Sequence, residues 1–269
     1  MEKRELGRTR EKIPVLGMGT WEIGDAQDEK RALEVKALRR GIELGMSMID
    51  SAEMYGYGNA EKLVGQAIKG IRDDVFIATK VSPEHFSYEG ILSSCESSIR
   101  RLGVEHIDLY QLHWPSHQVP IGETMKAMEE LVAHGKIRYI GVSNFSVAQT
   151  LKARESLPRS EIASNQIRYS LTHRSIESGL LPFCEREKLT VIAYQPLDSG
   201  KLPGSKIPQA LLEKYSMTPA QLMLNWVTYR NGVVAIPKAA NVEHVEENAV
   251  AVRTRISADD YRALSRIFE

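Results

Sequence analysis

The sequence predicts an α/β fold: a (β/α)8 TIM barrel formed as a single domain by residues 1–269. Short apolar runs alternate regularly with longer amphipathic ones, which is the pattern of successive βα units. Most of the short runs are apolar or β-branched throughout, as parallel strands covered on both faces are. No linker rich in Gly, Ser or charged residues separates the units, so nothing marks a boundary between two domains.

Eight short segments are expected to be the strands of the barrel. Each is an apolar or β-branched run of the length of one strand. They cover residues 15–20, 46–50, 75–80, 107–113, 138–143, 162–167, 190–194 and 233–237. Ahead of them, residues 4–13 predict a small hairpin, which would close the far end, or bottom, of the barrel.

Amphipathic stretches between these segments predict the helices. Residues 88–102 place apolar side chains on one stripe, and Gly103 then provides a stop signal. Thr218 and Pro219 open another helix as its N-cap and its first helical residue. A last helix is expected near residues 257–267.

A doubly wound parallel sheet is the competing fold. It usually carries the motif G-x-G-x-x-G directly after its first strand. Here the first strand leads to Gly17-Met18-Gly19-Thr20-Trp21, which lacks the third glycine and opens no immediate helix. The barrel is therefore the better interpretation.

The composition excludes several classes of function. Of the 269 residues, 42% are hydrophobic, which suffices for a sizeable core. Lys+Arg and Asp+Glu number 35 each, and this zero net charge gives no electrostatic case for nucleic acid or an anionic membrane as a partner. We expect a small molecule as the partner and a monomer, although the sequence leaves an oligomer open.

The chain has the features of a cytoplasmic protein. Its start is charged, and no apolar run approaches the roughly 18 residues of a membrane-spanning helix, so we expect neither a signal peptide nor a span. Cys95 and Cys184 lie far apart among apolar neighbours at helical spacing. We therefore expect buried, reduced thiols rather than a disulfide or a nucleophile.

Three polar residues each follow an apolar run at the end of a predicted strand. They are Asp50, Lys80 and His113, separated by 30 and 33 residues, or about one βα unit each. In a barrel, the carboxyl ends of neighbouring strands meet on the face where active sites form. Tyr55 follows Asp50 by five residues in the same loop. The sequence thus predicts one pocket that holds an acid, a cation, an imidazole and a phenol.

These four side chains suit the reduction of a carbonyl group by hydride. A free tyrosine has a pKa near ~10, and an ammonium close to it is expected to lower that value. Asp50 is the obvious counter-ion to keep a buried Lys80 charged. A neutral His113 can donate one ring N–H to a substrate oxygen. The set thereby provides a proton for a carbonyl oxygen that gains negative charge.

Each residue taken alone has an ordinary explanation, such as a capping Asp or a Lys that reaches solvent. Four of them on one barrel face favour a site instead. The remaining histidines show no ligand spacing, and neither H-E-x-x-H nor C-x-x-C occurs, so no metal is predicted.

The chain resembles the aldo-keto reductases, in particular prokaryotic members with a short C-terminal tail. The motifs that carry the resemblance occur in family order over nearly the whole chain. They are Gly17-Met18-Gly19-Thr20-Trp21, Asp50-Ser51-Ala52-Glu53-Met54-Tyr55-Gly56, Lys80, Leu112-His113-Trp114-Pro115, Gly141-Val142-Ser143-Asn144-Phe145, Asn165-Gln166, Ala193-Tyr194-Gln195-Pro196-Leu197 and Ile236-Pro237-Lys238.

The resemblance implies roles for the catalytic residues. Tyr55 would be the general acid in reduction and the general base in oxidation, Lys80 and Asp50 would tune it, and His113 would orient the carbonyl. Trp21, Tyr55, His113 and Trp114 would contact the substrate. A serine, Ser82, stands where some relatives have a tryptophan, which leaves one wall of the pocket smaller. An aromatic pocket with few charges favours small aldehydes and ketones.

The resemblance also implies a nicotinamide cofactor. Ser143, Asn144 and Gln166 would bind its carboxamide and Tyr194 would stack on its ring, although ordinary strand-end capping is an alternative for the first three. The implied cofactor contacts are Gly19, Thr20, Asp50, Ser143, Asn144, Gln166, Tyr194, Leu197, Ser199, Lys238, His244, Glu247 and Asn248. Residues 198–206 are expected to act as a lid over the pyrophosphate, or to be a plain solvent loop.

The choice of cofactor depends on Lys238. In the family, this lysine pairs with the 2′-phosphate of NADPH, and an arginine further along adds a second contact. This chain has Ala239 next and His244 in place of that arginine. We expect NADP(H) to be preferred and NAD(H) to be possible, because a histidine replaces a bidentate contact with a weaker one. His244 could also be a plain solvent-facing helix residue.

Two other functions remain open. One is a non-catalytic nicotinamide-binding, redox-sensing module, against which the four intact catalytic residues argue. The other is a barrel enzyme of different chemistry, such as a lyase or hydrolase. After the last helix the chain stops at Glu269, without the long loop that covers the substrate in many relatives, and we expect an open pocket.

Overall fold

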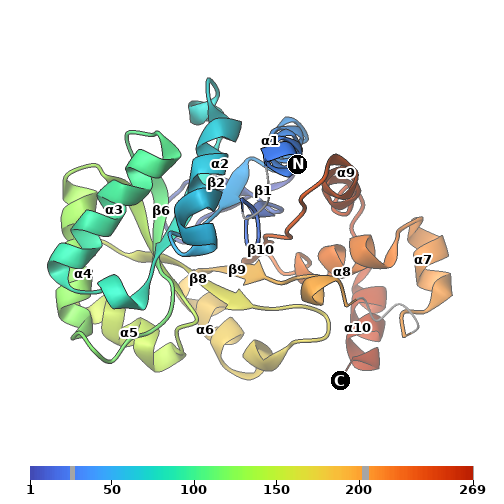
Figure 1. Ribbon diagram of the computed structural model, residues 1–269. Coiled ribbons are helices and arrows are strands. Elements are labelled where there is room, and N and C mark those ends of the chain that lie inside the picture. The colour runs from blue at the N-terminus through green and yellow to red at the C-terminus, as the bar shows by residue number, and fades with distance from the viewer. Residues whose placement is uncertain (25–27, 202–205, 269) are drawn as a thin grey trace.

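The computed structural model describes residues 1–24, 28–201 and 206–268. Within these residues, eight parallel strands form one sheet in which each strand pairs with the next in sequence (Figure 1). They are β3 (Met18–Gly19), β4 (Met48–Asp50), β5 (Phe76–Val81), β6 (Ile107–Leu112), β7 (Ile137–Ser143), β8 (Ile162–Arg168), β9 (Thr190–Tyr194) and β10 (Val233–Ala235).

The first and last strands close the barrel through single bridges. Leu16 pairs with Ala235 and Gly19 pairs with Lys238, both parallel. The (β/α)8 fold is therefore confirmed. The two closing strands are shorter than the predicted 15–20 and 233–237, because isolated bridges replace a continuous ladder between them.

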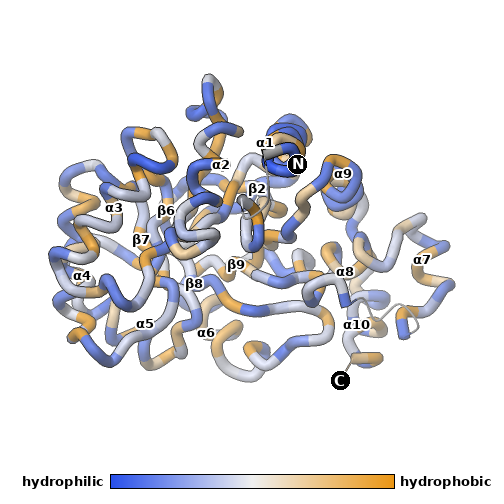
Figure 2. Tube along the Cα trace, in the orientation of Figure 1, coloured by the Kyte–Doolittle hydropathy of each residue, from blue (hydrophilic) through white to orange (hydrophobic). Residues whose placement is uncertain are grey.

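Helices surround the strands (Figure 1) and alternate hydrophilic and hydrophobic positions along their length (Figure 2). They are α1 (Asp28–Glu43), α2 (Asn59–Ile68), α3 (Tyr88–Leu102), α4 (Ile121–Ala133), α5 (Val147–Glu155), α6 (Leu180–Glu187), α7 (Gln209–Tyr215), α8 (Pro219–Val227), α9 (Val242–Val250) and α10 (Ala258–Ile267). Short 3-10 turns occur at η1 (Tyr55–Gly58), η2 (Arg72–Asp74), η3 (Pro83–His85), η4 (Ser175–Ser178) and η5 (Asp198–Gly200).

The helix signals in the sequence are confirmed. Helix α3 covers the predicted residues 88–102 and ends at Gly103, which has φ = 65°. Thr218 caps α8 by accepting a hydrogen bond from the Gln221 N–H, and Pro219 is the first helical residue. Helix α10 begins after the cap Ser257.

An antiparallel hairpin closes the bottom of the barrel, as predicted. Its strands are β1 (Lys3–Glu5) and β2 (Lys12–Pro14). Leu6 and Ile13 are fully buried and pack with interior side chains of the barrel such as Leu109. The hairpin thus seals the interior at the amino ends of the strands, which leaves the carboxyl ends for the site.

Both cysteines are free and buried, as expected. Burial raises the pKa of the Cys95 and Cys184 thiols to about 12, so both stay protonated at neutral pH. Among the helices of the described residues, none is long and apolar enough to cross a membrane.

Candidate active site

The structure brings Asp50, Tyr55 and Lys80 into direct contact at the carboxyl ends of β4 and β5. The Lys80 ammonium nitrogen lies 2.6 Å from Asp50 Oδ2 and 2.8 Å from the Ser51 carbonyl oxygen. It also donates to the Tyr55 hydroxyl oxygen at 3.2 Å. All three of its N–H bonds therefore have acceptors within the protein, and the ammonium is held against the phenol.

The charge on Lys80 is retained although its side chain is fully buried. Burial alone would lower the pKa of Lys80, but the Asp50 carboxylate and the Tyr55 hydroxyl outweigh it, and the pKa is raised. This is the counter-ion role expected for Asp50.

Lys80 lowers the pKa of Tyr55, as expected, but burial of the phenol outweighs this effect. Burial raises the pKa of Tyr55, and the nearby ammonium of Lys80 offsets that rise only in part. The pKa of Tyr55 therefore ends above its ordinary value. The side chain is only 9% exposed, and the Asp50 carboxylate repels the negative charge of a phenolate. The phenol stays protonated at neutral pH.

His113 follows β6 and faces Tyr55, with 5.6 Å between the two ring centroids. Burial and the charge on Lys80 lower the pKa of His113 to about 2, so the imidazole is neutral. Its Nδ1 is buried without a hydrogen-bond partner among the described residues. A proton on Nδ1 would be an unpaired buried donor, so the Nε2–H tautomer is favoured.

A second layer of amides fixes the other oxygen of Asp50. Gln166 Nε2 donates to Asp50 Oδ1 at 2.7 Å, and Gln111 Nε2 donates to the same atom at 3.2 Å. Gln111 was missed from the sequence. It lies in β6 two residues before His113, so both side chains point to the same face of the strand. A glutamine near the carboxyl end of a buried strand was the signal that could have found it.

The end of β7 is tied to its neighbours by side-chain hydrogen bonds. Ser143 Oγ donates to the Gln166 carbonyl at 3.0 Å, and Asn144 Nδ2 donates to the His113 carbonyl at 3.1 Å. Tyr194 completes the set by donating to Asn144 Oδ1 at 3.0 Å. These bonds include the capping contacts that the sequence left as an alternative. Asn144 also has φ = 62°, a left-handed conformation that is unusual away from glycine and concentrates at functional sites.

The mouth of the site carries exposed apolar side chains. Trp21, Met54 and Trp114 are 49%, 42% and 40% exposed, so the two tryptophans are not core residues. Trp21 meets the Tyr55 ring edge-on at 5.0 Å between centroids, and Trp114 stacks on His113 at 3.9 Å. Ser82 is buried, and its backbone N–H donates to Glu53 Oε1.

Gly19 and Thr20 lie beside the site. A Cβ on Gly19 would approach the Ile236 carbonyl oxygen to 2.9 Å, so the close approach of the closing strands requires a glycine. The Thr20 hydroxyl donates to the Asp50 carbonyl at 3.0 Å. Thr20 therefore holds the backbone at Asp50.

The predicted contacts with the adenosine end of the cofactor divide into two groups. Lys238 and His244 are exposed, and the Lys238 ammonium lies 3.8 Å from Glu22 Oε2. Glu247 instead accepts a hydrogen bond from the cap Thr218 at 2.8 Å, and Asn248 is buried. The structure thus presents two basic side chains to solvent and turns the other two residues toward the protein.

The loop after β9 is anchored by an ion pair. Arg168 Nη2 lies 2.6 Å from Asp198 Oδ1, and the Thr172 hydroxyl donates to Asp198 Oδ2 at 3.0 Å. Leu197 is half-buried and Ser199 is exposed. Of the predicted lid over residues 198–206, residues 202–205 lie outside the described part of the chain. Among the residues that the structure describes, no group of three or more His, Cys, Asp or Glu side chains could hold a metal ion.

Comparisons with known proteins agree on one protein family. A family model described as "Aldo/keto reductase family" matches residues 15–269. Methylglyoxal reductase YeaE of Escherichia coli (strain K12) is 40% identical over 261 residues, which is 95% of this chain and 91% of the relative.

Solved structures of similar proteins superimpose on most of the chain. A thermostable aldo-keto reductase, solved with the inhibitor epalrestat, has a TM-score of 0.95 and 38% identity over 99% of this chain and 100% of its own. An aldo-keto reductase from Klebsiella pneumoniae, solved in complex with NADPH, has a TM-score of 0.90 and 41% identity over 100% of this chain and 96% of its own.

Proposed function

The chain belongs to the aldo/keto reductase family, and from this premise we propose that it reduces small aldehydes and ketones to alcohols with NADPH, Tyr55 acting as the proton donor. The observation that carries the proposal is the contact of the Lys80 ammonium with the Tyr55 hydroxyl at 3.2 Å, backed by Asp50. A buried cation beside a phenol stabilises the phenolate that proton donation leaves behind.

The residues present fit a nicotinamide cofactor. The ends of β7, β8 and β9 bring Asn144, Gln166 and Tyr194 to the side of Asp50 and His113, where a nicotinamide would meet the substrate. Lys238 offers a cation and His244 a ring N–H for a 2′-phosphate, so NADP(H) is preferred and NAD(H) is the second cofactor. When bound, the cofactor supplies the hydride that reaches the carbonyl carbon.

The protein's own groups act on the carbonyl oxygen. The Tyr55 hydroxyl and the Nε2–H of His113 donate hydrogen bonds to it and hold the carbonyl in place. As negative charge develops on that oxygen, Tyr55 transfers its proton and Lys80 stabilises the resulting phenolate. In alcohol oxidation the same phenolate accepts the proton.

The substrate class follows from the mouth and from the relatives. Trp21 and Trp114 form aromatic walls, while no charged side chain of the described residues contacts the Tyr55 hydroxyl apart from Lys80. Such a pocket suits a small uncharged carbonyl compound, and a 2-oxoaldehyde such as methylglyoxal is our first choice of substrate. Because one chain contributes all of these groups, we propose a single-domain monomer as the working unit.

Tyr55→Phe tests the proton donor. With methylglyoxal and a panel of small aldehydes, NADPH consumption by the variant should fall on the order of 10²–10⁴-fold, since general acid catalysis contributes that much. NADPH binding, followed by quenching of protein fluorescence, should persist. Tyr88→Phe on α3, outside the site, is the matched control and should keep wild-type rates.

Two outcomes would contradict the proposal. Near wild-type turnover by Tyr55→Phe would show that another group delivers the proton. Tight NADPH binding by the wild-type protein without turnover of any carbonyl would favour a non-catalytic nicotinamide-binding module instead.

A further inference from the structure

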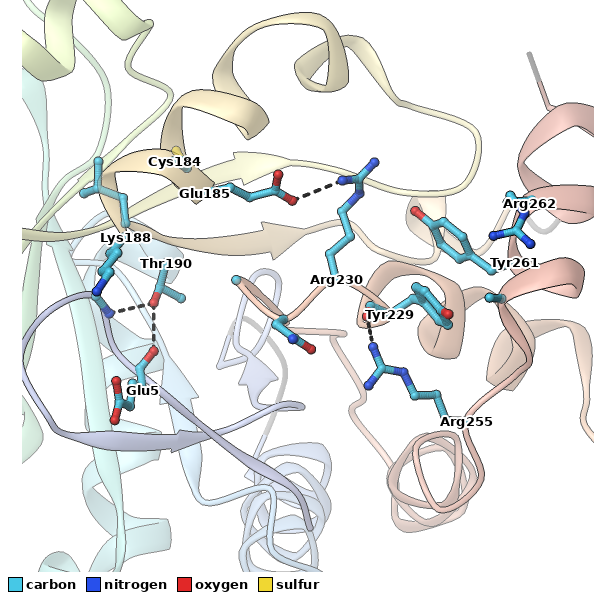
Figure 3. A pocket seen from close by; sticks show the side chains of 15 residues that line it. Glu5, Cys184, Glu185, Lys188, Thr190, Tyr229, Arg230, Arg255, Tyr261 and Arg262 are labelled. Atoms are coloured by element: carbon cyan, nitrogen blue, oxygen red, sulfur yellow. Dashed lines mark hydrogen bonds and ion pairs between the residues drawn. The ribbon is translucent and has the colours of Figure 1, made fainter.

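A cavity of about 750 Å³ opens at the end of the barrel opposite the candidate active site. It lies where β9 and β10 begin, between the hairpin, the turn from α6 into β9, and α10 (Figure 3). Its volume falls within the range of small-molecule sites. Chemistry in these barrels occurs at the other face, so this cavity needs an explanation of its own.

Hydrogen bonds between neighbouring segments hold the walls of the cavity in place, so the cavity is already formed in the free protein. The Arg4 guanidinium donates to the carbonyls of Thr228, Arg230 and Val233 at 2.5–2.7 Å, which fixes the loop between α8 and β10. Thr190 Oγ accepts from the Gly7 N–H at 2.8 Å and donates to the Glu5 carbonyl at 3.2 Å.

One end of the cavity is cationic, because Arg230 and Arg255 both line it. Arg230 Nη1 donates to Glu185 at 3.1 Å, and its Nε is buried beneath the cavity surface. The Arg255 guanidinium lies over the Tyr229 ring at 4.6 Å and donates to the Tyr229 carbonyl. No carboxylate of the described chain pairs with Arg255. The charge of Arg255 is therefore available to an anionic ligand.

The other end of the cavity carries a carboxylate beside a lysine and a threonine. Figure 3 shows Glu5, Lys188 and Thr190 together at one end, and Arg230, Arg255 and Tyr261 at the other. In the described part of the chain, Glu5 has no ion-pair partner, so its carboxylate can accept hydrogen bonds from ligand hydroxyl groups. Guanidinium groups match the geometry of phosphate oxygens.

We propose that this cavity binds a sugar phosphate, with the phosphate at Arg230 and Arg255 and the sugar hydroxyls toward Glu5. A ligand of this chemistry brings an anion to Arg255, which has no carboxylate partner in the described chain, and uses both ends of the cavity. The site is separate from the carbonyl-reducing site and does not depend on the proposed function.

Calorimetric titration of the full chain tests the proposal, with ribose 5-phosphate, ribose and inorganic phosphate as probes and no nicotinamide cofactor present. Ribose 5-phosphate should bind most tightly, inorganic phosphate at least ~10-fold more weakly, and ribose without measurable heat. Arg255→Met and Arg230→Met should each weaken the sugar phosphate at least ~10-fold. Arg266→Met, an exposed arginine on α10 that does not line the cavity, should leave its affinity unchanged.

Other results would overturn the proposal. Absence of binding by ribose 5-phosphate would do so, as would equal affinity for ribose 5-phosphate and inorganic phosphate, which indicates a plain anion site. An equal loss in Arg266→Met would indicate nonspecific attraction. Arg255→Met guards against misfolding, since the Arg230–Glu185 pair stays intact in it. Carbonyl reduction by both cavity variants should remain at the wild-type rate, so failure here is distinct from failure of the proposed function.

Discussion

The Lys80 ammonium nitrogen lies 2.6 Å from Asp50 Oδ2, and the two side chains are only 0% and 2% exposed. An ion pair this deep loses the hydration of both charges, and the mutual attraction repays that cost only when further hydrogen bonds are made. Here the Ser51 carbonyl, Tyr55, Gln111 and Gln166 supply them. Removing either partner would leave an uncompensated buried charge.

Asp50→Asn should therefore affect both stability and turnover. The unpaired ammonium should lower the free energy of unfolding by about 3–5 kcal/mol, and the pKa of Lys80 should fall because Asp50 is the main group that raises it. Urea unfolding and NADPH turnover measure the two effects. The matched control is Asp259→Asn at the surface, where loss of the Arg262 pair should cost about 1 kcal/mol or less. An Asp50→Asn protein as stable and active as the wild type would refute the account.

His113 should make the stability depend on pH. Its folded pKa of about 2 lies below the ordinary value of ~6.5, so between these values the unfolded chain binds more protons. The free energy of unfolding is therefore highest above pH ~6.5 and falls on acidification, by about 2 kcal/mol at pH 5. Unfolding free energies measured from pH 5 to 8 for wild type, His113→Gln and the exposed control His85→Gln check this. A slope unchanged in His113→Gln would contradict it.

Tyr55 should set the pH dependence of the reaction. Because burial raises the pKa of Tyr55 above its ordinary value near ~10, the phenol remains a proton donor throughout neutral pH. The kcat/KM for reduction should stay flat from pH 6 to 9 and fall only in more alkaline solution, while alcohol oxidation should rise in that range. A loss of reduction centred near pH 7 would indicate a different acid.

Lys238 should carry the preference for NADPH. Lys238→Met should raise the KM for NADPH about 10-fold and leave the KM for NADH unchanged, since only NADPH has the 2′-phosphate. His244→Arg should widen the preference by restoring a bidentate partner. Initial rates with each cofactor measure this, with the exposed Lys36→Met on α1 as the control. Equal efficiency of the wild-type protein with both cofactors would eliminate the preference.

Tyr57 should be destabilising where it stands. It is 98% exposed and has φ = 52° between two left-handed glycines, Gly56 and Gly58, so its Cβ is strained and its ring gains no packing. Tyr57→Gly should raise the free energy of unfolding by about 1 kcal/mol. Tyr57→Ala keeps the Cβ and should give no such gain, and equal stability of the two variants would disprove the strain.

Sequence patterns predicted most of the fold because local signals and tertiary structure agree along this chain. Helix α3 has an apolar stripe and a terminal glycine, and its bounds could be read directly. The strands β3 and β10 were overestimated because their apolar runs extend past the few bridges that barrel closure allows. The apolar character of a residue indicates that it is buried. Whether it pairs as part of a strand depends here on a neighbouring strand from the far end of the chain.

The chemistry of the site was less accessible. Their positions at the ends of successive predicted strands indicated that Asp50, Lys80 and His113 would share a face, but the pKa of Tyr55 depends on how deeply the phenol is buried. Gln111 supports Asp50 only because its side chain reaches past β5 from β6 to the end of β4, and no spacing in the sequence reports that distance.

The three carbonyls held by Arg4 belong to residues 224 to 229 positions later in the chain. During synthesis, this guanidinium can pair with the nearby Glu2, but its three backbone acceptors are missing until nearly all of the barrel has been made. Contacts of such long sequence separation form slowly, because the whole intervening chain must first be ordered. Sealing of the barrel floor is thus a late event in folding.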